Sequence, residues 1–204
     1  MTRVKETYTG EARRLATRSM EQLGQTRLTP DALSLSGLGL CVAGSVIVYF
    51  EYRAWWLFIV GGVVFVLGSV LDILDGALAR AGGKGTPFGA FLDSTIDRVG
   101  EAFMLTAIAL TFMRDGREWA VALTVVAVIG SFLVSYTRAK AEILGLKGDV
   151  GIGSRAERVA VIAIGLGLGS VGGLQWAIAL LALTAWATAA QRILFVRKQL
   201  LQKR

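Results

Sequence analysis

Residues 72–97 of the sequence read DILDGALARAGGKGTPFGAFLDSTID, at the end of one apolar segment and the start of the next. Four aspartates lie in this stretch: Asp72, Asp75, Asp93 and Asp97. Carboxylates at membrane depth are costly because hydrocarbon cannot hydrate them, so they persist mainly where they pair with cations, line a polar cavity or bind metal. Four of them close together in the sequence favour a metal site.

The spacing of these aspartates fits two helix faces. Asp72 and Asp75 are three residues apart, and Asp93 and Asp97 are four apart, so each pair shares one face of its helix. The chain has no histidine and one cysteine, which leaves hard oxygen ligands of the kind that Mg²⁺ or Mn²⁺ prefers. Two such ions side by side are a common device for phosphoryl displacement.

The composition predicts an all-α integral membrane protein. The chain has 204 residues, of which 54% are hydrophobic, and a mean hydropathy of +0.58. A chain with this composition is too apolar for an ordinary soluble domain. The net charge of +7 comes from basic residues between apolar stretches, without a nucleic-acid motif. We therefore expect anionic lipid and phosphorylated substrates as partners, and no nucleic acid.

Six apolar stretches are close to the length that spans a bilayer, and we predict six transmembrane helices in a domain of residues 29–204. They cover residues 32–50, 55–74, 88–113, 119–136, 159–171 and 174–196. The fifth stretch is the weakest, and its helix is expected to begin earlier, near Arg155. Its Gly165, Gly167 and Gly169 would allow close packing against other helices of the same chain, with dimerisation as the alternative.

Residues 1–28 form a separate predicted element. Apolar and small residues recur there at steps of three and four, which indicates an amphipathic helix lying at the membrane interface. A solvated helix packed on the bundle is the alternative. The segment lacks the apolar run and cleavage site of a signal peptide. Pro30 is expected to open the first spanning helix, where a proline breaks no internal hydrogen bond.

The distribution of Lys and Arg predicts the orientation. They gather in the amino-terminal segment, in the loops at residues 75–85 and 138–158, and in the tail at residues 197–204. Such loops face the cytoplasm. We therefore expect a multi-pass protein of the cell membrane, with both termini and the aspartates on the cytoplasmic side.

The aspartate stretch matches the pattern D-x-x-D-G-x-x-A-R-x8-G-x3-D-x3-D at every fixed position. On these residues the chain resembles the CDP-alcohol phosphatidyltransferases. The resemblance implies a membrane enzyme that transfers the phosphatidyl group of a CDP-activated lipid such as CDP-diacylglycerol to an alcohol and releases CMP. It implies two Mg²⁺ or Mn²⁺ ions held by Asp72, Asp75, Asp93 and Asp97, with Asp97 also the general base.

The resemblance also implies a site for the CDP-lipid. The matching residues are Asp31, Ala32, Leu33, Ser34, Gly76, Ala79, Arg80 and Thr86. Gly76 and Ala79 are small enough for the nucleotide to approach, and Arg80 would hold pyrophosphate oxygens. For Asp31 a helix cap remains the alternative, and for residues 82–85 a flexible turn.

The acceptor is inferred from a basic cluster. Its residues are Ser135, Arg138, Lys140, Arg155, Arg158 and Arg192. Arg192 lies inside the last apolar stretch, where a guanidinium is costly unless a partner or an anionic ligand meets it, and a phosphate monoester is the simplest such ligand. The cluster resembles that of the phosphatidylinositol phosphate synthases, which use inositol 1-phosphate, and of the archaetidylinositol phosphate synthases. Alternatively, Arg138, Lys140 and Arg158 contact lipid headgroups.

Other functions fit parts of the sequence. A phosphatidylglycerol phosphate synthase would share the aspartates and use glycerol 3-phosphate. A divalent-cation transporter could use the same acids as a transit site, although such sites are usually framed by interrupted helices near the midplane. The family resemblance also implies a homodimer.

Overall fold

The computed structural model describes residues 30–81 and 86–202, and for residues 30 and 73–81 it describes the backbone alone. Within these ranges every regular element is a helix, so the prediction of an all-α protein is confirmed there. The α-helices are α2 (Pro30–Tyr49), α3 (Leu57–Ala81), α4 (Pro87–Arg114), α5 (Glu118–Ile143), α6 (Arg155–Gly167) and α7 (Leu174–Gln202), and the short 3₁₀-helices are η1 (Glu51–Arg53) and η2 (Gly169–Val171). The amphipathic helix predicted for residues 1–28 lies outside the described residues.

Each predicted apolar stretch coincides with one of these α-helices. Pro30 opens α2 and Arg155 opens α6, both as expected. In the described ranges, three helical segments are long and apolar enough to cross a membrane: Asp31–Arg53, Glu118–Ile143 and Leu174–Gln202. The apolar part of α3, Leu57–Asp72, is shorter.

The fifth predicted stretch is shorter as a helix than its sequence suggested. The α-helix ends at Gly167, and residues 169–171 continue as η2. The 13 residues of α6 rise about 20 Å, less than the roughly 30 Å of a hydrocarbon core. The helix starts only after the loop at residues 144–154, so Arg155 and Arg158 lie in its first two turns.

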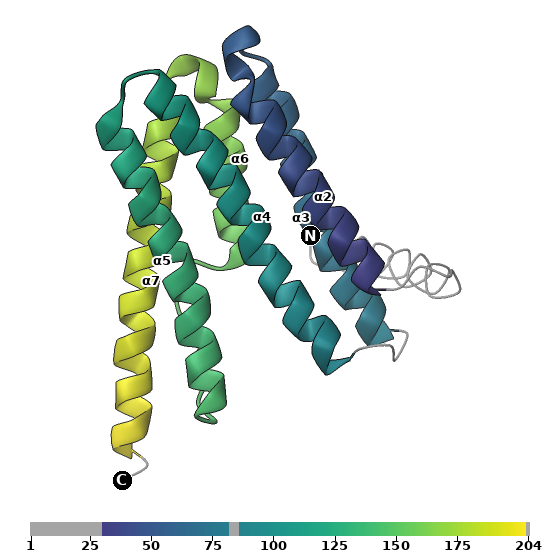
Figure 1. The fold of residues 1–204 in the computed structure, drawn as a ribbon. Coiled ribbons are helices and arrows are strands. Elements are labelled where there is room, and N and C mark those ends of the chain that lie inside the picture. The colour runs from purple at the N-terminus through teal and green to yellow at the C-terminus, as the bar shows by residue number, and fades with distance from the viewer. Residues whose placement is uncertain (1–29, 82–85, 203–204) are drawn as a thin grey trace, which may run out of the picture.

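The helices form a bundle in which α4 runs between two helix pairs (Figure 1). Helices α2 and α3 lie side by side in one pair, α5 and α7 form the other, and α6 packs against α3 and α7. The last turns of α3 and the first turns of α4 approach one another at one end of the bundle. This brings the two halves of the aspartate stretch together.

Glycines allow the α2–α3 pair to approach until the two backbones touch. A Cβ atom on Gly37 would lie 2.8 Å from the carbonyl oxygen of Gly68, and one on Gly44 would lie 2.7 Å from that of Gly61. Small residues at a helix interface allow this approach in lipid, where packing takes over much of the role of the hydrophobic effect. The contact places Asp72, one turn after Gly68, beside α2.

The predicted packing role of the glycines in the fifth stretch holds for two of the three. A Cβ on Gly165 would lie 2.6 Å from that of Ala177, and one on Gly169 would lie 2.8 Å from the Phe58 ring. Gly167 has no atom of the described residues within 4 Å of the same position, so no close contact among them requires glycine there.

The interior of the bundle is apolar, and so is much of its outer surface. The fully buried side chains include Phe65, Met104, Leu105, Ile108, Phe112, Ile162, Leu166, Ile178 and Leu181. On the outside, Trp176 and Leu183 of α7 are 68% and 69% exposed. Large exposed apolar surfaces are rare on soluble monomers, and these suit contact with lipid.

The α2–α3 contact generates the first prediction. Gly68→Ala should lower the free energy of unfolding by about 1–3 kcal/mol, because the new methyl group would meet backbone atoms that cannot move aside. Unfolding of the purified protein in detergent would measure the change. Gly39→Ala is the matched control on α2, since its Cβ would meet no atom within 4 Å in the part of the chain that the structure describes. Equal stability of the two variants would show that the backbone contact is not required.

Candidate active site

The three aspartates of the pattern whose side chains the structure describes converge at the end of the bundle where α3 meets α4. One carboxylate oxygen from each of Asp72, Asp93 and Asp97 lies within 4.8 Å of the others. Asp93 and Asp97 project from the same face of α4, as their spacing predicts, and Asp72 reaches them from α3. The side chain of Asp72 is only 3% exposed. Three acids thus share one small, partly buried volume.

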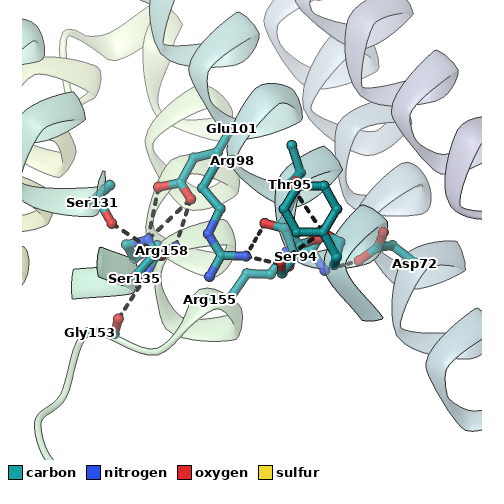
Figure 2. Close-up of polar contacts among 12 residues, drawn as sticks. Asp72, Ser94, Thr95, Arg98, Glu101, Ser131, Ser135, Gly153, Arg155 and Arg158 are labelled. Carbon is teal, nitrogen blue, oxygen red and sulfur yellow. Dashed lines mark hydrogen bonds and ion pairs between the residues drawn. The ribbon is translucent and has the colours of Figure 1, made fainter. Parts of the chain in front are cut away.

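Arg155, the first residue of α6, is the main described counter-charge of this group. It forms an ion pair and hydrogen bond with Asp72, and its Nη2 lies 2.6 Å from Asp97 Oδ1. Figure 2 shows Arg155 reaching toward Asp72, with Arg98 nearby. The Nη1 atom of Arg98 lies 3.7 Å from Asp97 Oδ2 and donates a hydrogen bond to the carbonyl of Ser94 on its own helix.

The carboxylates keep unused acceptor capacity, which is the observation that tests whether a metal fits. Asp72 Oδ1 is buried and accepts no hydrogen bond from the described residues. Asp97 Oδ1 is close to Arg155 but does not accept a directed hydrogen bond from it. Buried carboxylate oxygens are normally satisfied. Spare lone pairs on Asp72 and Asp97, with an oxygen of Asp93 close by, suit Mg²⁺ or Mn²⁺.

Four of the five remaining members of the aspartate pattern lie on the last turns of α3, and the fifth, Gly89, lies on α4. Its helical backbone continues through Asp75, Gly76, Ala79 and Arg80, so Asp75 lies one turn after Asp72. For these four residues the structure describes the backbone alone. Their proposed contacts with metal and CDP-lipid therefore stay predictions.

The start of α4 is tied to the start of α2. Thr86 is the N-cap of α4, and its Oγ1 accepts a hydrogen bond from the Gly89 N–H at 2.9 Å. A Cβ on Gly89 would lie 3.1 Å from that hydroxyl and 3.3 Å from Asp31 Oδ1 of α2. Glycine in this position of the pattern lets the two helix ends approach. Asp31 lies in the first turn of α2, and Ser34 one turn on is buried.

A large pocket of about 810 Å³ opens beside the aspartates, between α4, α5, α6 and α7. Asp93 and Asp97 line it, together with Arg98. Five of the six residues predicted for the acceptor also line it: Ser135, Arg138, Arg155, Arg158 and Arg192. The sixth, Lys140, is not among the lining residues; its Nζ lies 5.7 Å from the centre of the Tyr136 ring. The structure therefore leaves Lys140 out of the predicted cluster.

The cations of the pocket are bound in different ways. Arg138 pairs with Glu142 one turn along α5, and both side chains are more than half exposed. Arg158 is buried, and forms a two-pronged pair with Glu101 at 2.8–2.9 Å. It also donates a hydrogen bond to the Gly153 carbonyl at 2.8 Å. The charge of Arg158 is thus neutralised inside the protein.

Arg192 is buried without a described carboxylate partner. Its Nε donates a hydrogen bond to the Val150 carbonyl at 2.8 Å, and its Nη1 donates to the carbonyl of Val134. Backbone carbonyls satisfy the hydrogen bonds but leave a net positive charge. A buried guanidinium that faces a pocket in this state favours an anionic ligand.

The loop at residues 144–154 is held in place by these two arginines. Arg192 contacts it at Val150 and Arg158 at Gly153. Gly151 has φ +108°, and a Cβ there would lie 2.4 Å from Cγ2 of Thr188 on α7, so both the backbone and the space require glycine. The loop thus forms one fixed wall of the pocket.

A capping box starts α6 at the end of this loop. Glu157 accepts a hydrogen bond from the Ser154 N–H at 2.7 Å, and the Ser154 side chain caps the helix in return. Hydrogen bonds from Ser154 hold the pKa of Glu157 below its usual value. The cap sets where α6 begins and therefore where Arg155 projects.

Glu101 is a residue of the site that the sequence analysis missed. It follows Asp97 by one helical turn, so Asp93, Asp97 and Glu101 line one face of α4. This repeat of acids every four residues in an apolar helix was the available signal. Its partner Arg158 lies 57 residues away, and a pairing at that distance is visible only in the structure.

Comparisons with known proteins assign the class. The model of the CDP-alcohol phosphatidyltransferase family matches residues 27–190. The chain belongs to the CDP-alcohol phosphatidyltransferase family, and it is an enzyme of that class and a membrane protein. It is 37% identical over 187 residues to the archaetidylinositol phosphate synthase of Pyrococcus horikoshii, covering 89% of this chain and 92% of that one.

Further relatives point to a narrower group. The phosphatidylinositol phosphate synthase of Mycolicibacterium smegmatis is 37% identical over 178 residues, covering 83% of this chain and 78% of that one. The crystal structure of the Mycobacterium tuberculosis phosphatidylinositol phosphate synthase with CDP-DAG bound matches with a TM-score of 0.80 and 30% identity, over 90% of this chain and 94% of that one. The same enzyme with manganese and citrate matches with a TM-score of 0.78.

The buried ion pair generates the second prediction. Arg158→Met should lower the free energy of unfolding by about 3–5 kcal/mol, because Glu101 would keep a buried charge without a partner. Adding Glu101→Gln to this variant should restore part of the loss. The matched control is Arg138→Met, whose exposed pair with Glu142 contributes about 0–1 kcal/mol. Equal losses for Arg158→Met and Arg138→Met in unfolding measurements would contradict the prediction.

Proposed function

We propose that this protein transfers the phosphatidyl group of CDP-diacylglycerol to inositol 1-phosphate, forming phosphatidylinositol phosphate and CMP. Membership of the family and similarity to the mycobacterial synthases support this reaction, including the relative with CDP-DAG bound. One observation carries it to this chain: Asp97 and Arg155 line both the cavity beside Asp72 and the large basic pocket. The acidic and basic halves of the site are thus continuous.

The donor would bind at the ends of α2, α3 and α4. Asp31, Ala32, Leu33 and Ser34 of α2, Gly76, Ala79 and Arg80 of α3, and Thr86 before α4 are the proposed contacts. The close approach of Asp31 to Gly89 supports this assignment, because it brings the first turn of α2 to the aspartates. Arg80 would meet the pyrophosphate with its fork of donors.

Two Mg²⁺ or Mn²⁺ ions are proposed as cofactors, with Asp72, Asp75, Asp93 and Asp97 as ligands. The convergence of three carboxylates supports a divalent cation here, as does the manganese complex of the relative. When bound, the ions would neutralise the pyrophosphate and the charge that develops on the departing CMP. The ion count rests on the family resemblance.

Asp97 is the proposed general base. Its side chain is 13% exposed and faces the basic pocket, while Asp72 is nearly inaccessible. An acceptor hydroxyl in the pocket could therefore reach Asp97 and give up its proton as it attacks the β-phosphorus of the CDP-lipid. A positioned base of this kind contributes about 10²- to 10⁴-fold to the rate.

The acceptor phosphate is proposed to bind among Ser135, Arg138, Arg155 and Arg192. The strongest support is Arg192, which is buried and forms no direct ion pair with a described carboxylate, so that an anionic phosphate could meet its charge. Arg158 would contribute by holding the pocket wall, since Glu101 already neutralises it. Lys140 was predicted in the same group but has no support from the pocket lining.

Two neighbouring reactions remain as alternatives within the family. One alternative is a different donor, a CDP-activated archaeal lipid. The archaetidylinositol phosphate synthase of Pyrococcus horikoshii supports it, because this chain is as similar to that protein as to the bacterial synthase, at 37% identity each. A glycerol 3-phosphate acceptor would use the same aspartates. Transport of divalent cations is set aside because the chain belongs to an enzyme family.

The proposed setting is the cell membrane, crossed six times, with both termini and the site in the cytoplasm. Arg138, Arg155 and Arg192 gather at the site end of the bundle, which supports this orientation by the positive-inside rule. Residues 1–28 would lie on the membrane surface as an amphipathic helix, with residues 29–204 as the catalytic domain. The homodimer is proposed from the family resemblance.

The third prediction tests the acceptor. Purified protein with CDP-diacylglycerol and Mn²⁺ should release CMP with inositol 1-phosphate and not with unphosphorylated inositol, because the pocket cations recognise the phosphate. Glycerol 3-phosphate and a CDP-activated archaeal lipid would be offered in parallel. The measurement is CMP release together with the mass of the lipid product. Faster reaction with glycerol 3-phosphate than with inositol 1-phosphate would overturn the proposed acceptor.

The fourth prediction separates the two roles of the aspartates. Asp97→Asn should lower CMP release by about 10²- to 10⁴-fold because the base is lost. It should spare Mn²⁺ binding more than Asp72→Asn does. Asp115→Asn, at the far end of α4, is the control and should leave both measurements unchanged. If Asp97→Asn keeps wild-type CMP release, Asp97 is not the base.

A further inference from the structure

Arg155 contacts the same carboxylates that would hold a divalent cation. Its guanidinium pairs with Asp72 Oδ2 of α3 and, at 2.6 Å, with Asp97 Oδ1 of α4. Both acids contribute to the group whose ligand oxygens lie within 4.8 Å of one another. We propose that Arg155 is an exchangeable counter-ion: it neutralises the aspartates until a divalent cation binds, and the cation then displaces it. This inference rests on the proposed metal dependence of the enzyme.

The two cations would compete because they need the same oxygen atoms. Each of these acids is more than four-fifths buried, and like charges so close together are costly without a positive partner. Arg155 supplies that partner from a third helix, at the first residue of α6. A metal ion beside the same oxygens would meet a full positive charge unless Arg155 moved away.

Comparison with Arg158 shows why Arg155 can move. The side chain of Arg158 is 5% exposed, and its guanidinium is held by both oxygens of Glu101 and by the Gly153 carbonyl. The side chain of Arg155 is 25% exposed and divides its contacts between two acids on different helices. Neither contact is the two-pronged pairing that fixes Arg158. Three residues along one helix thus separate a fixed arginine from a displaceable one.

The displaced side chain has a place to go. Arg155 lines the small cavity beside Asp72 and also the 810 Å³ pocket. Rotation of a long side chain from one to the other requires no movement of α6, because long side chains sample several staggered rotamers. In the pocket its guanidinium would join Arg138 and Arg192. Metal binding would therefore add one cation to the side where the acceptor phosphate is proposed to bind.

The test measures Mn²⁺ affinity without substrate, using the electron paramagnetic resonance signal of free Mn²⁺ over purified protein in detergent. Arg155→Met removes the competing charge and keeps most of the stem. It should bind Mn²⁺ about tenfold more tightly than the unmodified protein. Arg138→Met removes one charge from the same pocket, away from Asp72 and Asp97, and is the matched control. Its affinity should change less than about threefold, as expected for a screened charge.

A second measurement follows thermal unfolding in EDTA and in Mn²⁺. Without metal, Arg155→Met should unfold at a lower temperature than the unmodified protein, because Asp72 loses its ion-pair partner and Asp97 keeps only the longer contact with Arg98 among the described residues. With saturating Mn²⁺ the difference should disappear. Arg155→Lys keeps the charge but cannot bridge two acids with one planar group. Its Mn²⁺ affinity should therefore fall between those of the unmodified protein and Arg155→Met. It also provides a readout if Arg155→Met does not fold.

Mn²⁺ affinity of Arg155→Met equal to or weaker than that of Arg138→Met would overturn the proposal. So would a stability loss of Arg155→Met that Mn²⁺ does not correct. These outcomes are independent of the acceptor, because neither measurement contains CDP-lipid or inositol 1-phosphate. Absence of Mn²⁺ binding by the unmodified protein would instead refute the proposed metal site itself.

Discussion

Charge balance among buried acids is the constraint on which the site depends. Asp72, Asp93, Asp97 and Glu101 lie near one another on α3 and α4, in a protein whose surroundings are mostly apolar. Carboxylates in such a setting need positive partners. Arg155 and Arg158 supply them from the start of α6, so this short helix is bound to the longer ones by ion pairs as well as by packing.

The start of α6 is set by its capping box and by the contacts of the loop before it. Ser154 and Glu157 cap the helix, and Arg158 holds Gly153 of the loop before it. Arg192 holds the same loop from α7 through Val150. The loop therefore has a defined path despite its length, and the pocket beside it has a rigid wall. A preorganised pocket needs less ordering when a charged ligand enters.

The apolar framework supplies the alignment. The glycine contacts between α2 and α3 determine how close these helices lie, and Gly89 lets the start of α4 approach Asp31. An acid on α2, one on α3 and two on α4 reach the same end of the bundle as a result. Figure 1 shows how far apart in sequence the helices that meet there are. Small residues at the crossings and charged residues at the ends thus have complementary roles.

The sequence alone determined the helices and the shared face of Asp93 and Asp97, because hydrophobic runs and helical periodicity are local properties. The eight fixed residues of the pattern at residues 72–97 were likewise sufficient to identify the family. Tertiary structure decided which charges meet: Arg155 pairs with an acid 83 residues away and Arg158 with one 57 residues away, whereas both had been assigned to the acceptor alone. It also left Lys140 out of the pocket lining. Such pairings depend on how helices cross, and no local pattern encodes the partner of a buried charge.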